Sequence, residues 1–497
     1  MCGIAGAFDV TSPQLLPRTW VAAASQAMRR RGPDAEGVAQ APGFVAAHRR
    51  LKVIDLDGSP QPWVDPQSGD VLVFNGEIYN YRELRHALSQ QGVAFRSEGD
   101  TEVLLRTLQR WGREGLSRLN GMFAFAWYRA CDRRVWLVRD HAGIKPLFFT
   151  FVEGRAYFAS SMAALLTFPG VSRVLDLATF SHYLSTIRTT LGARTLIEGV
   201  CTLEPGHLLE CTPAQPTGTP ERWWSLPALP ASEKARRPMA EVAEQVHQLT
   251  RQAVERQLVS DVPLGGFLSG GLDSTIIASQ VRDLTAGDYS CFSVGYAGHD
   301  ATGNPHHEFP YVDVATRELG LQCRQIELDE ADYLADWRFL VEHKGQPLST
   351  PNEVSIYRLA VALGEAHTVA LSGEGADEIF AGYAVPYASV WDFERAALAS
   401  TWPAPQREQF EAALTALYGT TQFSSMIDHY LRLNSWIPLA LKYKLLTAET
   451  IVGARHDEPM LRHYHERLGE LSHLSPMDRY LHLLAQTNLE CLLSRLD

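Results

Sequence analysis

A cysteine directly follows the initiator methionine in the opening segment MCGIAGAFDV. The small side chain of Cys2 favours removal of Met1, which would place the Cys2 thiol beside a free α-amine. Such an amine has a pKa of about 7.7 to 8.0, so at neutral pH part of it is uncharged and can act as general base for the thiol. Cys2 is therefore a candidate nucleophile that needs no histidine. The alternative is a small apolar residue at the start of a strand.

A nucleophile that attacks a carboxamide creates an oxyanion, which needs hydrogen-bond donors already in place. The segment VLVFNGEIYN offers the side-chain amide of Asn75 and the backbone N–H of Gly76 as such donors. Asn-Gly between two β-type runs is also a strong signal for a tight hairpin turn. Both interpretations can hold for the same turn.

An α-amino acid substrate also needs a cation for its carboxylate and anions for its ammonium group. Arg50 in AAHRRLKVIDL suits the carboxylate by bidentate pairing, and Glu77 and Asp100 suit the ammonium. Taken singly, each of these residues is explained as a solvated surface charge. Taken together with Cys2, they describe a site for glutamine.

Seven segments resemble, in family order, the glutaminase domain of glutamine-dependent asparagine synthetases. They are MCGIAGAFD, RRRGPDAEG, HRRLKVIDLDGSPQP, FNGEIYNYREL, GDTEVLL, LNGMFAFAWYRACDRRVWLVRDHAGIKPLFF and LEPGH. The resemblance implies that the N-terminal cysteine releases ammonia from the side-chain amide of glutamine. It assigns the nucleophile to Cys2, the oxyanion hole to Asn75 and Gly76, and glutamine binding to Arg50, Asn75, Gly76, Glu77 and Asp100.

A second candidate site begins at SGGLDS, residues 269–274, which follows the apolar run GGFL and precedes a helix-like stretch. Consecutive glycines after a strand let backbone N–H groups face an anion, and a helix N-terminus adds a favourable dipole. The loop is not a Walker A motif, because GxxxxGK[ST] is absent. It resembles the pyrophosphate loop of ATP pyrophosphatases, which split ATP into AMP and pyrophosphate.

A second strand ends similarly, at TVALSGEGADEIFAGY. In an open α/β sheet both loops lie at the carboxyl edge of the strands, where ligands bind. Asp273 and Asp377 are then candidate ligands of Mg2+, which prefers a few carboxylates together with phosphate oxygens. Simple solvation of an acidic loop is the alternative.

The family resemblance implies specific roles around these two loops. The pyrophosphate ligands would be Ser269, Gly270, Gly271, Asp273 and Ser274, and the AMP ligands Phe267, Val294, Ser372 and Gly373. Asp273 and Asp377 would bind Mg2+, and Glu374 would be the acid/base group near the acyl-adenylate and the incoming ammonia.

The leading hypothesis is a glutamine-hydrolysing asparagine synthetase that uses ATP and Mg2+ to adenylate aspartate and lets ammonia displace AMP. A paralogue that amidates another carboxylate, or a subunit with an incomplete synthetase half, stays open. A tRNA-modifying ATP pyrophosphatase is disfavoured by the glutaminase half.

The sequence departs from the family pattern in four places. Gln346 and Thr350, in HKGQPLSTPNEV, stand where acidic residues are expected. LQCRQIEL lacks the expected paired histidine, and FASSMAALL lacks a Glu and a Lys. The chain stops at TNLECLLSRLD, before the helices in which the family carries a catalytic lysine. An incomplete product, a second polypeptide that completes the site, and an impaired synthetase half are the three open explanations.

These residues need two kinds of scaffold. Short β-type runs such as VLVF, FAFAWY and RVWLV predict layered antiparallel sheets, as in Ntn hydrolases, over residues 1–206. A proline-rich stretch, 207–238, predicts a linker whose Trp223 and Trp224 dock on a domain surface. Alternating strands and helices over 239–497 predict a doubly wound parallel sheet, with mostly helices after about residue 384, in a synthetase domain apparently truncated at its C-terminus.

Composition limits which partners, which structural metals or disulfides, and which location we expect for the protein. The chain has 497 residues and a formal net charge of −12, and the negative charge disfavours broad nucleic-acid binding. Its seven cysteines are an odd number without CxxC spacing, which disfavours a disulfide scaffold and a structural zinc site. No secretory leader or apolar run of about 18 residues is present, so we expect a cytoplasmic protein without membrane contact. Expected partners are the small molecules glutamine, aspartate and ATP, and a homodimer stays open. The segment His306-His307-Glu308 is interpreted as a loop rather than a metal site.

Overall fold

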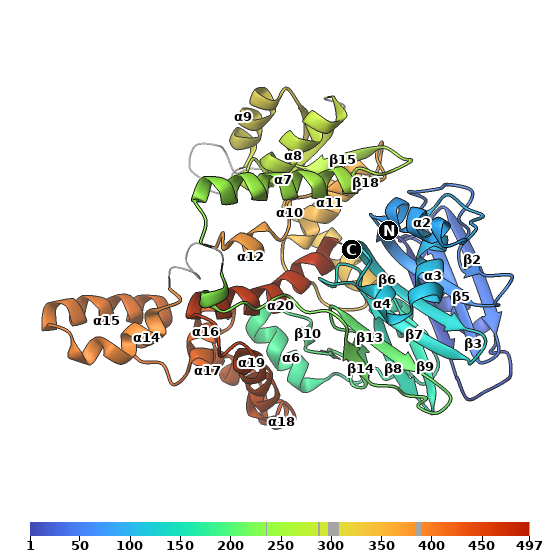
Figure 1. The fold of residues 1–497 in the computed structure, drawn as a ribbon. Helices are drawn as coiled ribbons and strands as arrows, with labels where there is room; N and C mark the ends of the chain where they lie inside the picture. Colours follow the sequence, from blue (N-terminus) through green and yellow to red (C-terminus); the bar gives the residue numbers. More distant parts are fainter. Residues whose placement is uncertain (235, 287–288, 297–307, 384–388, 497) are drawn as a thin grey trace.

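The computed structural model describes residues 1–234, 236–286, 289–296, 308–383 and 389–496. The N-terminal part contains two antiparallel sheets and the C-terminal part contains a parallel sheet with helices (Figure 1). This arrangement confirms the predicted fold class. His306 and His307, which the sequence places in a loop, lie outside the described residues.

The first sheet has eight strands and the second has six. In spatial order the first sheet is β10 (Thr190–Leu191), β11 (Arg194–Thr195), β12 (Val200–Thr202), β8 (Phe148–Val152), β9 (Arg155–Ala159), β1 (Gly3–Phe8), β3 (Phe44–Arg50) and β2 (Ala35–Ala41). The second is β14 (Pro220–Arg222), β13 (His207–Cys211), β7 (Arg134–Arg139), β6 (Gly121–Arg129), β5 (Val71–Ile78) and β4 (Trp63–Val64).

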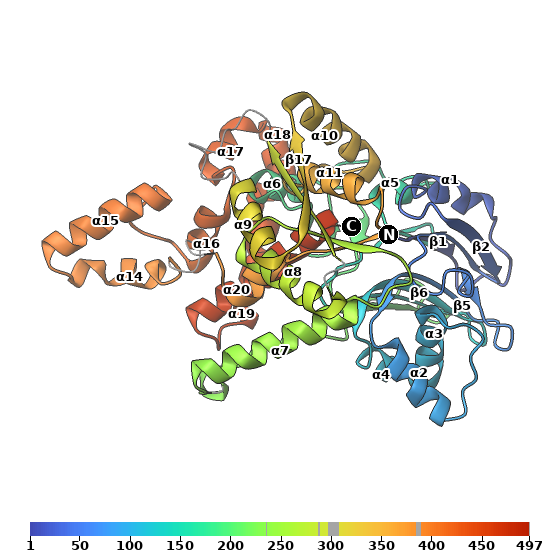
Figure 2. The same cartoon turned by 90° about the horizontal axis from the view of Figure 1, so that it is seen from above.

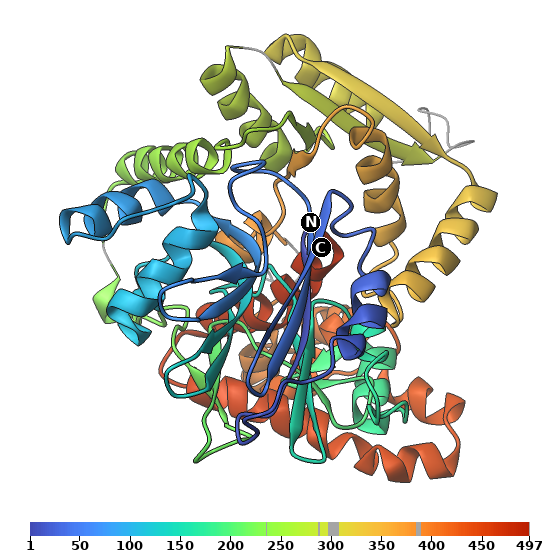
Figure 3. The same ribbon diagram turned by 90° about the vertical axis from the view of Figure 1, so that its right-hand side faces the viewer.

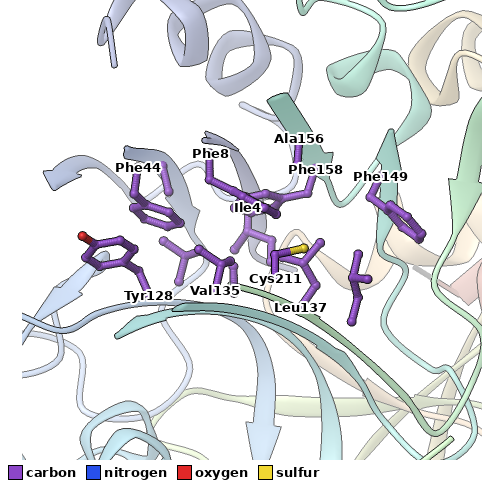
Figure 4. Packing of buried hydrophobic residues seen from close by; sticks show 14 of the residues in the cluster. Ile4, Phe8, Phe44, Tyr128, Val135, Leu137, Phe149, Ala156, Phe158 and Cys211 are labelled. Carbon is purple, nitrogen blue, oxygen red and sulfur yellow. The ribbon is translucent and has the colours of Figure 1, made fainter. Parts of the chain in front are cut away.

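The two sheets pack face to face and enclose an apolar core (Figure 4). Strand β1 is buried along its whole length because it has a partner on each face. Its Ile4 and Phe8 point into the core between the sheets, whereas Ala5 and Ala7 belong to the cluster formed with the helices on the outer face. This alternation follows from the two-residue period of a strand. The side chains labelled in Figure 4 are Ile4, Phe8, Phe44, Tyr128, Val135, Leu137, Phe149, Ala156, Phe158 and Cys211.

Helices cover the outer faces of both sheets, so the N-terminal part has four layers (Figure 2). The eight-stranded sheet is covered by α1 (Thr19–Ala27) and α5 (Met162–Leu165). The six-stranded sheet is covered by α2 (Tyr81–Gln90), α3 (Asp100–Trp111) and α4 (Arg113–Leu116). Helix α6 (Leu177–Thr186) leads from this part toward the C-terminal helices.

The start of the predicted linker differs from the structure. Residues 207–211 form strand β13 of the six-stranded sheet, where Leu208, Leu209 and Cys211 are buried against β7. The prolines that suggested a linker come only after these apolar residues, so the predicted linker began too early in the sequence. The predicted docking of the tryptophans is confirmed, since Trp223 stacks on Phe123 at 6.1 Å between ring centroids.

The C-terminal sheet is parallel, with its four strands in the order β17 (Gln322–Leu328), β16 (Ser290–Tyr296), β15 (Leu264–Phe267) and β18 (Val369–Leu371). Parallel neighbours need crossover connections, which helices supply here. The helices of this region are α7 (Met239–Gln257), α8 (Leu272–Thr285), α9 (Phe309–Leu319), α10 (Glu330–Lys344), α11 (Glu353–Leu363) and α12 (Ala376–Phe380).

Helices make up the rest of the described chain, as predicted. They are α14 (Asp392–Leu398), α15 (Ala404–Tyr418), α16 (Met426–Asn434), α17 (Leu439–Leu445), α18 (Ala448–Gly453), α19 (Glu458–Glu470) and α20 (Pro476–Leu496). Helices α14 and α15 project from the body of the molecule, whereas α20 runs back toward the N-terminus (Figures 1 and 2). No helix among the described residues is both long and apolar enough to cross a membrane.

Candidate active sites

The first candidate site lies where strands from both N-terminal sheets end near one another. Cys2 immediately precedes β1, and β1 pairs with β3, which ends at Arg50. Asn75, Gly76 and Glu77 belong to β5 of the other sheet. A hydrogen bond of 3.0 Å between His48 Nε2 and the Phe74 carbonyl joins the two sheets beside these residues.

The Asn75 side chain is buried, with 1% of its surface exposed. Among the described residues its Nδ2 finds no hydrogen-bond acceptor. An unpartnered buried donor is costly and rare in folded proteins, and it is the state expected of a group that awaits a ligand oxygen. Asn75 therefore has the properties required of an oxyanion-hole donor.

Gly76 follows with φ of 155°, and a Cβ atom there would lie 2.0 Å from the Met122 carbonyl oxygen on β6. Any side chain would therefore force β5 away from β6. The glycine allows the backbone N–H next to Asn75 to hold its position in the sheet.

Arg50 is buried and its guanidinium donates to three backbone carbonyls. NH1 donates to Leu56 at 3.1 Å, and NH2 donates to Ile54 at 3.0 Å and to Asp55 at 2.8 Å. No carboxylate of the described residues pairs with it. The loop carbonyls orient the guanidinium and leave its full charge available for an anionic ligand.

Two acids complete the first site. Burial, and then the nearby Asp100 carboxylate, raise the pKa of Glu77 to about 7, against the opposing charges of Lys145 and the N-terminal ammonium. Burial raises the pKa of Asp100 to about 6, although Asp100 accepts a hydrogen bond from the Ile78 N–H at 3.0 Å. Two buried carboxyls that repel each other form a site for a cation such as an ammonium group.

Nearby charges also act on the pKa of the Cys2 thiol. Burial raises the pKa of the Cys2 thiol, while the N-terminal ammonium, Arg50 and Arg31 act to lower it. Its Sγ lies 3.6 Å from the Leu51 carbonyl oxygen. The structure thus brings the glutamine-site residues predicted from the sequence into one electrostatically connected group.

The second candidate site is a cavity of about 570 Å³ at the carboxyl edge of the parallel sheet. Most residues predicted to bind nucleotide or metal line it, from β15, β16, α8, α12 and the loops that precede the two helices. Those lining it are Phe267, Ser269, Asp273, Ser274, Val294, Ser372, Gly373, Glu374 and Asp377. Gly270 and Gly271 do not line the cavity.

Gly270 and Gly271 shape the loop instead. Gly270 has φ of 73°, and a Cβ there would lie 2.6 Å from backbone atoms of Tyr311 and Val312 on α9. The Gly271 N–H donates to the Ser269 hydroxyl at 3.2 Å, and Gly271 is the N-cap of α8. The glycines therefore turn the chain tightly between strand and helix, with the α8 N-terminus beside the cavity.

The polar end of the cavity is acidic. Burial, and then the carboxylates of Asp273, Glu378 and Glu374, raise the pKa of Asp377. Mutual repulsion between Asp273 and Asp377 is relieved by a cation between them, so the two residues fit Mg2+. Among the described residues no group of three or more His, Cys, Asp or Glu side chains is arranged to hold a metal. Further ligands would therefore be phosphate oxygens or water.

The other end of the cavity is apolar, with Phe267, Val294, Ile356 and Leu359 in its wall. A pocket that combines an apolar wall, against which a base can pack, with carboxylates that can attract a cation has the composition expected of an ATP site. Its volume lies within the range of small-molecule sites, about 300 to 1,000 Å³.

Arg495, Glu378 and Tyr383 are among the residues of this cavity that the sequence did not indicate. Arg495 Nε donates to Glu374 at 3.0 Å, and its NH1 donates to the Thr350 hydroxyl at 3.2 Å. An arginine on the mostly apolar segment CLLSRL was the available signal, but nothing local indicated its partner. Thr350, at a position where the family resemblance leads us to expect an acid, is thus a neighbour of the acid/base candidate.

The two candidate sites are linked through the neighbouring ends of the chain. The N-terminus and the end of α20 lie side by side in all three views (Figures 1, 2 and 3). Arg139 of β7 and Glu490 of α20 form an ion pair of 2.6 Å that is nearly excluded from solvent. The helix that carries Arg495 is therefore anchored to the sheet beside the first site.

Comparison with known proteins divides the chain in a similar way. Residues 1–224 match the family model described as a glutamine amidotransferase domain, and residues 245–497 match the model described as asparagine synthase. Asparagine synthetase [glutamine-hydrolyzing] 1 of Bacillus subtilis is 32% identical over 391 residues, which cover 77% of this chain and 59% of that protein. A putative asparagine synthetase of Mycobacterium tuberculosis is 34% identical over 386 residues, which cover 73% and 57%.

The chain thus spans less than two thirds of the length of these relatives. Among solved structures, an allosteric regulatory enzyme of purine biosynthesis shares 14% identity over 69% of this chain and 78% of that one, with a TM-score of 0.35. Similarity at this level supports no inference about function.

Proposed function

Because the chain belongs to the asparagine synthase family, with a glutamine amidotransferase domain before the synthase domain, we propose that it transfers ammonia from glutamine to an ATP-activated carboxylate. The observation that carries the proposal is the presence of two unsatisfied groups in the first site. The buried Asn75 amide nitrogen has no hydrogen-bond acceptor, and the Arg50 guanidinium has no carboxylate partner, among the described residues. These groups match the amide oxygen and the α-carboxylate of glutamine.

The glutaminase step requires removal of Met1, so that the α-amine of Cys2 can take the thiol proton. Cys2 Sγ attacks the side-chain amide carbon of glutamine, and the oxyanion forms at Asn75 Nδ2 and the Gly76 N–H. The carbon–nitrogen bond breaks, ammonia leaves with the proton returned by the amine, and water then cleaves the thioester to glutamate. Arg50 holds the α-carboxylate, while Glu77 and Asp100 hold the ammonium group.

In the second step an acceptor carboxylate oxygen attacks the α-phosphorus of ATP, and pyrophosphate leaves from the loop at Ser269–Ser274. Asp273 and Asp377 would hold Mg2+, which supplies positive charge against the phosphates. Ammonia then attacks the acyl carbon and AMP leaves, with Glu374 accepting a proton from the nitrogen. Arg495 donates to Glu374 at 3.0 Å and so orients that carboxylate in the wall of the cavity.

Aspartate is the acceptor that we propose, because the relatives are named asparagine synthetases. Thr350 beside Arg495 supports a second candidate, amidation of another carboxylate, since the family resemblance leads us to expect an acid there. A homodimer and a cytoplasmic location stay predictions.

The test measures pyrophosphate and glutamate in the same samples of the purified chain, with ATP, Mg2+ and glutamine, with and without aspartate. Aspartate-dependent pyrophosphate with matching asparagine would support the synthetase. Glutamate without pyrophosphate for any carboxylate would contradict the second step and leave only a glutaminase.

A Cys2→Ala variant separates the two steps. We expect no glutamate from this variant, and unchanged asparagine formation when ammonium chloride replaces glutamine. Loss of the ammonia-dependent reaction as well would contradict two separate sites.

A further inference from the structure

A second cavity, of about 490 Å³, lies between the two parts of the molecule. Its walls come from α6 and the β10–β14 region on one side, and from α12, α19 and α20 on the other. Among the described residues, Glu378 alone lines both this cavity and the ATP-sized cavity. No step proposed above uses this space.

The cavity is lined by a buried cation that has no counter-ion in the described part of the chain. Arg188 is only 6% exposed. Its NH1 donates to the Tyr464 hydroxyl at 3.1 Å and its NH2 approaches the Tyr430 hydroxyl at 3.5 Å, while its Nε has no partner among the described residues. No described carboxylate forms an ion pair with it.

A buried guanidinium that lacks an anion is unfavourable, because neutral hydroxyls replace only part of its hydration. The carboxylates that line the cavity are engaged elsewhere. Glu204 pairs with Arg467 at 2.6 Å, Glu490 pairs with Arg139, and Glu378 Oε1 accepts from Asn488 at 2.8 Å. An anionic ligand is therefore the missing partner of Arg188.

Two acceptors in the same cavity also lack donors. Gln486 Oε1 and Glu378 Oε2 are buried and have no hydrogen-bond partner among the described residues. Both call for an N–H group on the ligand. The remaining wall is largely apolar, with Leu226, Pro227 and Leu489.

We propose that this interdomain cavity binds a small carboxylic acid that carries an N–H donor next to the carboxylate and an apolar body. Arg188 takes the carboxylate, and Gln486 with Glu378 takes the N–H. A free apolar amino acid and an N-acylated one share this chemistry.

The imidazole that faces Arg188 does not compete with it for the anion. Burial, and then the charges of Arg467 and Arg188, lower the pKa of His463 to about 4, against the opposing charge of Glu204. His463 is therefore neutral at pH 7 and adds a hydrogen-bonding group without further charge. Of the described arginines that line the cavity, Arg467 and Arg222 have carboxylate partners and Arg188 has none, which suits a monocarboxylate better than a phosphate.

The test is calorimetric titration of the full chain with L-leucine and, separately, with N-acetyl-L-leucine, neither of which has a side-chain amide for Cys2 to attack. We expect saturable binding of at least one ligand below about 10 mM. Binding of leucine alone would identify the free amino acid as the source, and binding of the acetylated form would show that an amide N–H suffices. No binding of either ligand would overturn the proposal.

Three variants make the test specific. Arg188→Met should weaken binding at least about tenfold, because a charge-assisted hydrogen bond is lost. Gln486→Leu should weaken binding about threefold to tenfold without lowering the melting temperature, because its Oε1 has no described partner to lose. Arg222→Met is the matched control, since Arg222 lines the cavity but is partly exposed and lies 3.6 Å from Glu470. Equal affinity in Arg188→Met and wild type would overturn the assignment.

Discussion

At the scale of single residues, the first site is recognisable by what its polar groups lack. Asn75 Nδ2 has no acceptor and Arg50 has no anion among the described residues, while Glu77 and Asp100 repel each other. Each of these states is unfavourable without a ligand, and under the proposed function one molecule, an amino acid with a side-chain amide, would relieve all of them. The folding free energy that these unsatisfied groups cost would be recovered when the substrate binds, and would then contribute to its affinity.

Asn75→Ala should lower kcat for glutamate formation about 100- to 1,000-fold, the usual effect of removing one oxyanion donor. It should not lower the melting temperature, because Nδ2 makes no hydrogen bond within the described chain that could be lost. Asn80 is the matched control, since its Nδ2 donates to the Arg118 carbonyl at 2.8 Å. Asn80→Ala should destabilise the chain and leave kcat of the folded fraction unchanged. The reverse pattern would contradict an oxyanion role for Asn75.

The raised pKa of Glu77 predicts a pH dependence of glutamine binding. Below pH 7 the carboxyl is protonated and no longer attracts the substrate ammonium, so kcat/KM for glutamine should fall by up to about tenfold per pH unit. In Glu77→Gln this component should vanish and leave a shallower profile. Identical profiles for the two proteins would show that another group titrates there.

The same pKa shift predicts an effect on stability. Because the folded pKa of Glu77 lies above its usual 4.5, the unfolded chain loses this proton first, and stability falls as pH rises from about 4.5 to 7. Glu77→Gln should therefore melt at a higher temperature than wild type at pH 8, with the difference disappearing near pH 4. Thermal melts at the two pH values measure it.

At the scale of elements, the turn between β15 and α8 decides whether the second site exists. Gly270 brings the backbone against Tyr311 and Val312 of α9, in a conformation that favours glycine. The helix N-terminus can therefore approach the cavity only because this position has no side chain.

Gly270→Ala should abolish pyrophosphate release and cost more than about 2 kcal/mol of unfolding free energy, since a steric overlap adds to the strained φ. Gly320 provides the control, because it has φ of 66° and its Cβ, if one were added, would meet nothing within 4 Å among the described atoms. Gly320→Ala should cost only about 1 kcal/mol and keep activity. Activity retained in Gly270→Ala would contradict the role of this turn.

At the scale of the whole molecule, two hydrogen bonds between Asp261 and the loop at residues 53–55 form a strap between the two parts of the chain. The Asp261 N–H donates to the Val53 carbonyl at 2.9 Å, and the Asp55 N–H donates to Asp261 Oδ2 at 2.8 Å. Asp261 lies three residues before β15, and the carbonyls of Ile54, Asp55 and Leu56 hold Arg50. The loop that orients Arg50 is therefore tied to the strand that leads into the loop at residues 269–274.

Asp261→Ala should loosen the coupling between the sites, so that glutamate forms in excess of pyrophosphate. Asp261→Asn keeps an oxygen acceptor for the Asp55 N–H and should stay near the wild-type ratio. The ratio of the two products in one reaction measures the effect. A ratio unchanged in Asp261→Ala would show that the strap does not couple the sites.

The sequence by itself determined the fold class and several of the strands and helices. The two-residue alternation in FAFAWY and the strand–helix alternation after residue 260 are local patterns, so they can be interpreted without knowing the packing. The composition of SGGLDS likewise pointed to a tight turn, and Gly270 there leaves no room for a side chain. The hairpin turn predicted at Asn75-Gly76 is wrong, because both residues lie inside strand β5 and pair with β6. The boundary at 239 and the roles of the site residues stay predictions.

Only the tertiary structure decided which distant groups meet. Arg495 reaches Glu374 across 121 positions of sequence, and Glu490 reaches Arg139 across 351, with no local pattern to announce either pair. Strand β13 joins the sheet through burial against β7, although prolines follow it. Whether a charged side chain keeps a counter-ion depends on every element packed around it, which is why Arg188 and its cavity became visible only in the folded chain.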